Sequence, residues 1–168
     1  MQALKEKRVQ VLFVCLGNIC RSPMAKGAFA TQVAKAGLSD WIAADSAGLH
    51  DQFGGAPPDE RAQAVARRHR VDISPHRARR IEHHDFRAFD YILAMDLQNH
   101  ALLGALCPPG LKSKLHLLLD YAPQLTEREI PDPYYGGQNG FERAFQLAEE
   151  GARGLLAHLQ RQHFSTPR

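Results

Sequence analysis

Short hydrophobic segments alternate along this chain with segments of helical periodicity. Four segments have the length and apolar content of buried strands: residues 9–14, 41–47, 90–95 and 115–119. The last segment is so short that it equally fits the start of a buried helix. Between and after these segments, the apolar spacing predicts four helices: from Pro23 to Gly37, over residues 61–70 and 97–106, and from Asn139 onward.

The last predicted helix has the clearest pattern. Its apolar stripe consists of Phe141, Phe145, Ala148, Ala152, Leu155 and Leu159. Asn139, followed by Glu142 three residues later, has the spacing of a capping box, so the helix is expected to begin at Asn139.

Alternating strands and helices indicate an α/β fold, in which a parallel sheet is covered by helices on both faces. The 168 residues, of which 44% are hydrophobic, fit a single domain spanning residues 1–168 with one packed core. Residues 1–7 and 164–168 are expected to be flexible ends. Ligands of such folds bind beyond the carboxyl ends of the strands.

Composition indicates the cellular compartment of this domain and the kinds of ligand that it can bind. Three cysteines do not form a disulfide framework, and no apolar run reaches the length of a membrane span, so a cytoplasmic protein without membrane contact is expected. A net charge of +3 is too small to indicate nucleic-acid binding by itself. No metal is expected, because Cys15 and Cys20 lack ligand spacing and the pair His83 and His84 has no matching partners.

The turn after the first strand is built like an anion site. It reads VCLGNICRSPM and leads from the strand into the first helix. Backbone N–H groups of residues 16–21 can form a concave anion nest, in which Gly17 permits the bend and Asn18 tolerates a positive φ. Arg21 can bind two phosphate oxygens in a bidentate fork. The sequence therefore predicts a phosphate-binding loop between the first strand and the first helix.

The same turn favours chemistry at Cys15. An arginine and a helix N-terminus stabilise a thiolate, which is a nucleophile, and Ser22 is positioned to donate a hydrogen bond to the sulfur. A nucleophile facing a phosphate predicts a cysteinyl-phosphate intermediate without a metal. Asp132, held between two prolines, is the candidate general acid and base, although Asp-Pro is also common in plain turns.

These motifs together resemble the low-molecular-weight protein tyrosine phosphatases. The matching segments, in family order, are VCLGNICRSPMA, DSAG at 45–48, the Pro57-Pro58-Asp59 turn, FDYILAMD at 89–96 and DPYY at 132–135. The resemblance implies a four-stranded parallel sheet and a cofactor-free, two-step phosphatase. In it, Cys15 is the nucleophile, Arg21 the phosphate clamp and Asp132 the acid and base.

The resemblance also implies supporting roles. Asn18 is expected to hold the loop through hydrogen bonds with Ser22, Ser46 and His76, and Asp96 is interpreted as structural. Cys20 matches a second loop cysteine that can form a disulfide with the nucleophile, whereas Cys107 is interpreted as core. The phosphate loop includes Leu16, Gly17, Asn18, Ile19, Cys20 and Ser22, and the pocket rim is expected to include Phe53, Tyr134 and Tyr135. Where many members carry an aromatic residue, Phe53 can take that place or Gln52 can leave the wall polar.

The expected substrate is a phosphotyrosine-containing protein, and the expected assembly is a monomer or weak dimer. A phosphoarginine phosphatase stays open, although the resemblance associates that activity with a threonine where this chain has Ile19. Arsenate reduction would need two further cysteines, and only Cys107 lies outside the loop. A non-catalytic phosphate-binding or nucleic-acid-binding module is the alternative from another class.

Overall fold

The computed structural model describes residues 8–164 and contains one four-stranded sheet in which all strands are parallel. The strand order is β2-β1-β3-β4. The strands are β1 (Val9–Cys15), β2 (Ile42–Gly48), β3 (Tyr91–Ala94) and β4 (Leu115–Leu117). The predicted α/β class, with four parallel strands, is confirmed. The expectation of flexible ends at residues 1–7 and 164–168 falls outside the described residues, except for Phe164, which is the C-cap residue of α6.

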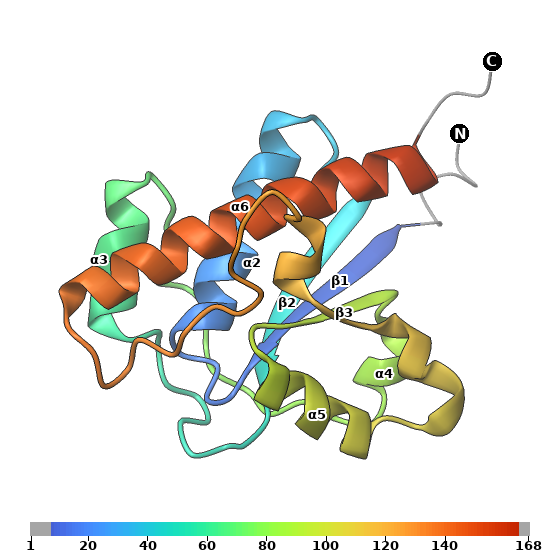
Figure 1. Cartoon of the computed structure of the whole chain (residues 1–168), viewed down its shortest axis with the longest axis horizontal. Helices are drawn as coiled ribbons and strands as arrows, with labels where there is room; N and C mark the ends of the chain where they lie inside the picture. Colours follow the sequence, from blue (N-terminus) through green and yellow to red (C-terminus); the bar gives the residue numbers. More distant parts are fainter. Residues whose placement is uncertain (1–7, 165–168) are drawn as a thin grey trace.

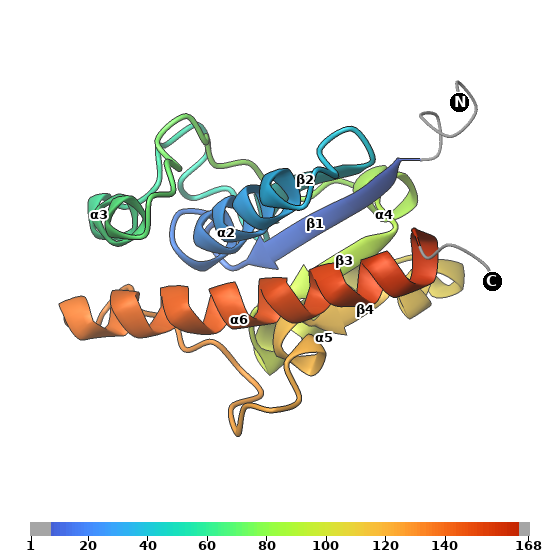
Figure 2. The same cartoon turned by 90° about the horizontal axis from the view of Figure 1, so that it is seen from above.

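Helices cover both faces of the sheet. The helical elements are α2 (Arg21–Lys35), α3 (Glu60–Arg68), α4 (Asp85–Ala88), α5 (Leu97–Leu106) and α6 (Gln138–His163), with two 3₁₀ turns, η1 (Pro109–Lys114) and η2 (Leu118–Tyr121). Helix α6 crosses the whole molecule in Figure 1, and Figure 2 shows α2 lying beside it. These two helices and α3 share one core, while α4 and α5 share the core on the opposite face.

The alternation of side chains along β1 explains why both faces are apolar. Val11 and Phe13 point into the core under α2 and α6, whereas Leu12 and Val14 point into the core under α4 and α5. All four side chains are fully buried. A strand buried on both faces reads as a continuous hydrophobic run, which is how residues 9–14 were recognised.

The strand order places a switch point at the end of β1. Strand β2 lies on one side of β1 and β3 on the other, so the connections leaving β1 and β3 diverge at the carboxyl edge of the sheet. Cys15 pairs with Gly48 at this edge, and Val14 pairs with Ala94. The crevice that such folds use for ligands therefore opens directly at Cys15.

Several element boundaries differ from the prediction, and one helix was not predicted. The fourth strand ends at Leu117, because the chain tightens into η2. Helix α6 begins at Gln138 after Gly137, without a side-chain cap, so the capping box at Asn139 is wrong. The carboxylate of Glu142 instead contacts His69 at 2.5 Å. The short helix α4 was not predicted, since a single turn leaves too little periodicity to detect.

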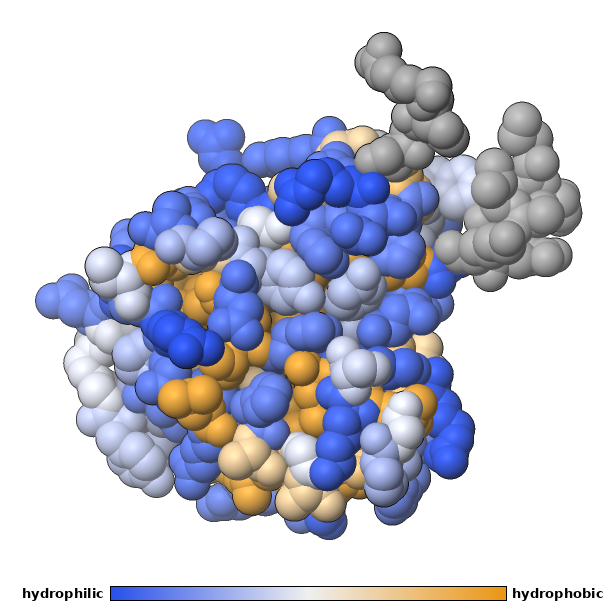
Figure 3. All heavy atoms as spheres, turned by 45° about the vertical axis from the view of Figure 1, so that its right-hand side comes forward, coloured by the Kyte–Doolittle hydropathy of each residue, from blue (hydrophilic) through white to orange (hydrophobic). Residues whose placement is uncertain are grey.

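Few large hydrophobic side chains are exposed among the described residues. On the face drawn in Figure 3, hydrophobic side chains form small patches separated by polar ones. The exposed large hydrophobic side chains are Leu97, Leu102 and Leu106 on α5, and Tyr135. Within residues 8–164, no helix combines the length and hydrophobicity that crossing a membrane requires.

Candidate active site

The turn from β1 into α2 brings the predicted phosphate loop to the carboxyl edge of the sheet. Asn18 has a φ of 60°, the left-handed conformation that its residue type tolerates. Helix α2 starts at Arg21, and Cys20 at its N-cap makes no side-chain hydrogen bond to the helix. The first N–H groups of α2 therefore face the loop, where an N-terminus attracts an anion.

The Asn18 amide is the centre of a buried network behind the loop. Its Nδ2 donates to Ser22 Oγ at 2.9 Å and to Ser46 Oγ at 3.0 Å. Its Oδ1 lies 3.1 Å from His76 Nε2 and accepts from the backbone N–H of Arg79 at 2.9 Å. The structure thus contains each of the expected hydrogen bonds, plus the one from Arg79. Burial is the main reason why the pKa of His76 is below its ordinary value.

Ser22 connects this network to the sulfur of Cys15. The Cys15 Sγ and Ser22 Oγ atoms are 3.0 Å apart, and both residues are buried. Because Ser22 Oγ accepts a hydrogen bond from Asn18, its own proton is available to the sulfur. The loop therefore presents a hydroxyl donor to the cysteine that was predicted to be the nucleophile.

Arg21 is buried, and two hydrogen bonds fix its guanidinium. Its Nη1 donates to Asp96 Oδ2 at 2.6 Å and to the backbone carbonyl of Ile130 at 2.8 Å. Burial alone would lower the pKa of Arg21, but the charges of Cys15, Asp96 and Asp132 raise it above its ordinary value. Asp96 also caps α5, because its Oδ1 accepts from the backbone N–H of Asn99 at 2.7 Å. Asp96 was interpreted as structural, and it makes two contacts of that kind: it holds Arg21 and it caps α5.

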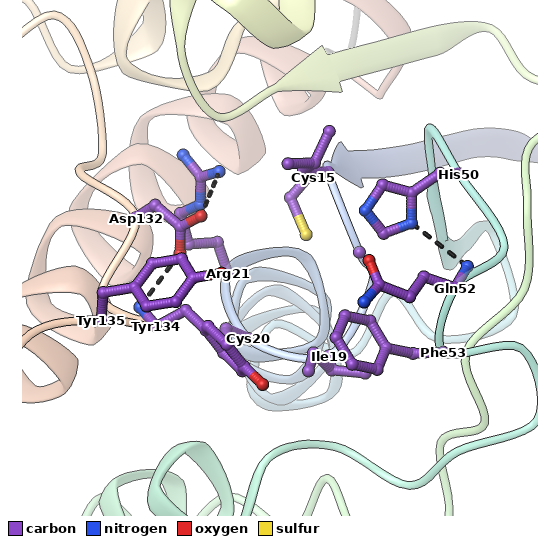
Figure 4. Close-up of a pocket in the computed structure, with 12 residues that line it drawn as sticks. Cys15, Ile19, Cys20, Arg21, His50, Gln52, Phe53, Asp132, Tyr134 and Tyr135 are labelled. Carbon is purple, nitrogen blue, oxygen red and sulfur yellow. Dashed lines mark hydrogen bonds and ion pairs between the residues drawn. The ribbon is translucent and has the colours of Figure 1, made fainter.

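Asp132 comes from a segment more than 100 residues along the chain and lies at the mouth of the same pocket (Figure 4). Its Oδ2 lies 3.7 Å from Arg21 Nη2, and its side chain is 41% exposed. Its Oδ1 accepts a hydrogen bond from the backbone N–H of Tyr134 at 3.1 Å, which orients the carboxyl group. An exposed, oriented carboxyl group beside the sulfur and the guanidinium can exchange protons with a bound molecule and with water.

The pocket floor is the phosphate loop, and its walls come from two other segments (Figure 4). Phe53 and Tyr134 form opposing aromatic walls, with ring centroids 6.0 Å apart. The lining residues are Cys15, Leu16, Gly17, Ile19, Cys20, Arg21, His50, Gln52, Phe53, Asp132, Tyr134 and Tyr135. Phe53 and Gln52 both line the pocket, so its wall contains an aromatic side chain and a polar one.

The second loop cysteine differs chemically from the first. Burial, together with the negative charges of Asp59, Cys15 and Asp132, raises the pKa of the Cys20 thiol far above its ordinary value. Cys15, Cys20 and Cys107 are all free thiols. Cys107 belongs to the core under α5, as expected for a packing residue. The disulfide between Cys15 and Cys20 stays a prediction.

Three contributors to the site were missed from the sequence. His50 lines the pocket, Arg79 supplies a hydrogen bond to Asn18, and Arg61 donates to the backbone carbonyl of Tyr134 at 3.1 Å. The position of His50, two residues past the strand that pairs with β1, was the one available indication. Among residues 8–164, no group of three or more His, Cys, Asp or Glu side chains is arranged to hold a metal ion.

Comparison with known proteins agrees with this geometry. The family model described as low molecular weight phosphotyrosine protein phosphatase matches residues 10–165. The chain belongs to this family. The resemblance noted in the sequence is therefore confirmed, and it covers nearly the whole chain.

Individual members of the family are similar over most of their length. The low molecular weight protein-tyrosine-phosphatase YfkJ of Bacillus subtilis is 43% identical, over 92% of this chain and 97% of its own. The crystal structure of YfkJ superposes with a TM-score of 0.86, at 42% identity, 93% coverage of this chain and 97% of YfkJ. A protein tyrosine phosphatase from Entamoeba histolytica, solved with Hepes in its active site, gives a TM-score of 0.88 at 35% identity, with 91% and 97% coverage.

One similar structure belongs to a protein that is named for a different substrate. The structure of DARP, a Drosophila arginine phosphatase, has a TM-score of 0.82 and is 36% identical, over 92% of this chain and 99% of its own. Phosphatases named for two different amino acids therefore share this fold, so the fold alone does not determine the substrate.

Proposed function

We propose that this protein is a metal-independent protein-tyrosine phosphatase, which hydrolyses phosphotyrosine in proteins through a cysteinyl-phosphate intermediate. One observation carries the proposal: Cys15 and Arg21 of the phosphate loop meet Asp132, which comes from a distant segment, in one pocket. A buried guanidinium, a helix N-terminus and an exposed carboxyl group around one sulfur supply what phosphoryl transfer to a cysteine needs.

In the first step, the thiolate of Cys15 attacks the phosphorus. The S–P bond forms while the bond between phosphorus and the tyrosine oxygen breaks, and Asp132 donates its proton to the departing oxygen. Arg21 holds the equatorial oxygens with the guanidinium N–H groups that Asp96 and Ile130 leave free. The Ser22 hydroxyl, 3.0 Å from the sulfur, stabilises its negative charge.

In the second step, water attacks the phosphorus of the cysteinyl phosphate. Asp132, now ionised, accepts a proton from the water, the O–P bond forms and the S–P bond breaks. Inorganic phosphate and the thiolate of Cys15 are the products. The exposure of Asp132 at the pocket mouth supports this step, because the carboxylate must reach both the leaving group and bulk water.

The walls of the pocket support tyrosine as the phosphorylated residue. The rings of Phe53 and Tyr134 contact each other in a tilted arrangement, so a substrate ring can pack against the exposed face of either one. Ile19 adds an apolar surface on the floor. A flat phenyl ring gains more from these apolar contacts than the polar guanidino group of phosphoarginine, which loses hydration against them.

Two other activities have less support. Cys107, the cysteine outside the loop, is buried in the core on the opposite face of the sheet, so it is poorly placed to relay a disulfide in arsenate reduction. For a nucleic-acid-binding module, Arg79 in the basic segment is already paired with Asp45 and Asp85. We further propose that the protein acts in the cytoplasm as a monomer or weak dimer.

The direct test is hydrolysis of phosphotyrosine, phosphoserine and phosphoarginine peptides in reducing buffer with a chelator. The parent protein is expected to prefer phosphotyrosine. Cys15→Ser should abolish turnover, and Asp132→Asn should lower kcat by about 10²–10⁴-fold. The loss in Asp132→Asn should be smaller for p-nitrophenyl phosphate, whose leaving group needs less protonation.

Two results would redirect the proposal. A preference for phosphoarginine would retain the mechanism and change the substrate. Folded parent protein that turns over none of these peptides would refute catalysis and leave the loop as an anion-binding site.

A further inference from the structure

His50 occupies the pocket wall between the phosphate loop and the aromatic residues. It lies two residues after β2, and its backbone N–H donates to the carbonyl of Leu16 at 3.3 Å. The preceding N–H, from Leu49, donates to the same carbonyl at 2.9 Å. These bonds tie the segment after β2 to the segment after β1, so the imidazole of His50 is held beside the loop.

The hydrogen bond to Nδ1 determines where the ring carries its proton. Nδ1 accepts from the backbone N–H of Gln52 at 3.3 Å. When Nδ1 accepts this bond, the proton lies on Nε2, which makes Nε2 a donor. Within the described part of the chain, no protein atom accepts a hydrogen bond from Nε2. Figure 4 shows this second ring nitrogen turned toward the side of the pocket that holds Cys15.

The contact with Gly17 shows how closely the ring approaches the loop. A Cβ atom added to Gly17 would lie 3.4 Å from His50 Cε1, the ring carbon bonded to Nε2. The Cε1 edge of the imidazole therefore lies close to the loop backbone at Gly17, with Nε2 next to it in the ring.

We infer that His50 binds the phosphoryl group: its Nε2–H donates a hydrogen bond to a non-bridging oxygen held by the loop. This inference rests on the proposed function, because it assigns the loop a phosphate ligand. Arg21 approaches that group from the α2 side, whereas His50 approaches from the β2 side. His50 thus completes the cradle on the side that the guanidinium does not reach.

Two substitutions separate this role from a merely structural one. In His50→Asn, the side-chain oxygen can take the place of Nδ1 and accept from the N–H two residues on, as in an Asx turn, but the Nε2 donor is lost. In His50→Gln, the longer amide can place an N–H near the Nε2 position, while the local acceptor is lost. Binding to phosphate therefore predicts that Gln preserves the function, and a structural role predicts that Asn does.

The experiment is a titration of each folded protein with inorganic phosphate, followed by the NMR shifts of backbone amides in residues 16–21. His50→Asn should weaken phosphate binding about tenfold, as expected for one lost hydrogen bond to an anion, and His50→Gln should weaken it less than threefold. His84→Asn, the same change at a histidine that is 70% exposed outside the pocket, should bind like the parent protein.

The inference is wrong if His50→Asn binds phosphate as tightly as the parent, if the order of the two variants is reversed, or if the parent shows no saturable shift. Because the readout is binding of a product that is not hydrolysed, it is independent of turnover. A parent protein that binds phosphate and hydrolyses no phosphotyrosine would refute the proposed function while leaving the comparison of His50 variants decisive.

Discussion

At the scale of single residues, Asn18 combines a strained backbone with a fully used side chain. Its φ is 60°, and its amide makes four hydrogen bonds in a buried site. Residue type alone predicted the positive φ, because asparagine tolerates it better than other side chains with a Cβ. The partners Ser46 and His76 came only from the family resemblance, since hydrogen bonds between distant segments leave no local pattern.

Replacing Asn18 separates these two contributions. Asn18→Ala should lower the free energy of unfolding by about 2–4 kcal/mol, because it leaves buried polar partners unpaired and keeps a Cβ at positive φ. Asn18→Gly should lose about 1 kcal/mol less, because glycine adopts this φ without strain. Urea denaturation of both variants measures the difference. Equal stability of the two variants would show that backbone strain is unimportant there.

Asp96 offers a second test at residue scale. In Asp96→Asn, the remaining oxygen can still cap α5 through Asn99, but the charge that holds Arg21 is removed. Stability should change little, while kcat/KM for an aryl phosphate should fall about 10–100-fold as the guanidinium loses its fixed orientation. A large loss of stability with unchanged kcat/KM would mean that Asp96 serves the fold alone.

His50 shows the limit of prediction for the site. The phosphate loop was recognisable because its residues are contiguous and lie between a strand and a helix. His50 stands alone in the sequence and reaches the pocket only because β2 pairs beside β1. Its place depends on strand order, which periodicity does not contain.

At the scale of elements, α6 illustrates how tertiary contacts override a local pattern. The spacing of Asn139 and Glu142 fits a capping box, yet Glu142 pairs with His69 and Arg68 from α3. The helix accordingly starts one residue earlier, without that cap. Its apolar stripe, including Phe141, Phe145 and Leu155, is buried as predicted, because burial of a helix face depends on periodicity that the sequence carries directly.

Two glycines in helices should respond to the same substitution with opposite signs. A Cβ on Gly154 of α6 would overlap the backbone carbonyl of Tyr121 in η2, so Gly154→Ala should destabilise the fold by about 2–4 kcal/mol. A Cβ on Gly104 of α5 would enter open space, so Gly104→Ala should stabilise it by about 0.5–1 kcal/mol. Thermal unfolding compares them. A stable Gly154→Ala protein would mean that α6 and η2 are packed more loosely than described.

At the scale of the whole molecule, the fold class followed from the alternation of segments, whereas the strand order β2-β1-β3-β4 did not. Parallel pairing is a non-local property, and several orders satisfy the same sequence of strands and helices. The observed order is what opens the crevice at Cys15. The sequence motifs therefore predicted a phosphate loop with a nucleophilic cysteine, but by themselves they did not predict which residues form the walls of the pocket.

Acid sensitivity of the whole fold is a further expectation. Burial lowers the pKa of His76, His116 and His158 below the ordinary value of 6.5. As the pH falls below about 6.5, the unfolded chain therefore binds more protons than the folded protein. The free energy of unfolding is accordingly higher above that pH and decreases below it.

Urea denaturation at pH 7 and pH 5 should show this loss. His116→Gln should make the fall in unfolding free energy smaller, because one of the three groups no longer titrates. Stability that stays constant or rises from pH 7 to pH 5 would contradict the assignment of partly buried, neutral histidines.

The most direct measurement is to trap the phosphorylated enzyme. Asp132→Asn should be mixed with p-nitrophenyl phosphate, whose leaving group needs little protonation, so that the second step, which needs the base, becomes the slow one. The chelated, reducing mixture is quenched within the first turnover and digested for mass spectrometry. One phosphoryl group on the fragment that contains Cys15, absent from Cys15→Ser, is the predicted result. A phosphoryl group on any other residue, or release of p-nitrophenol without phosphorylation of Cys15 at any quench time, would contradict the proposed mechanism.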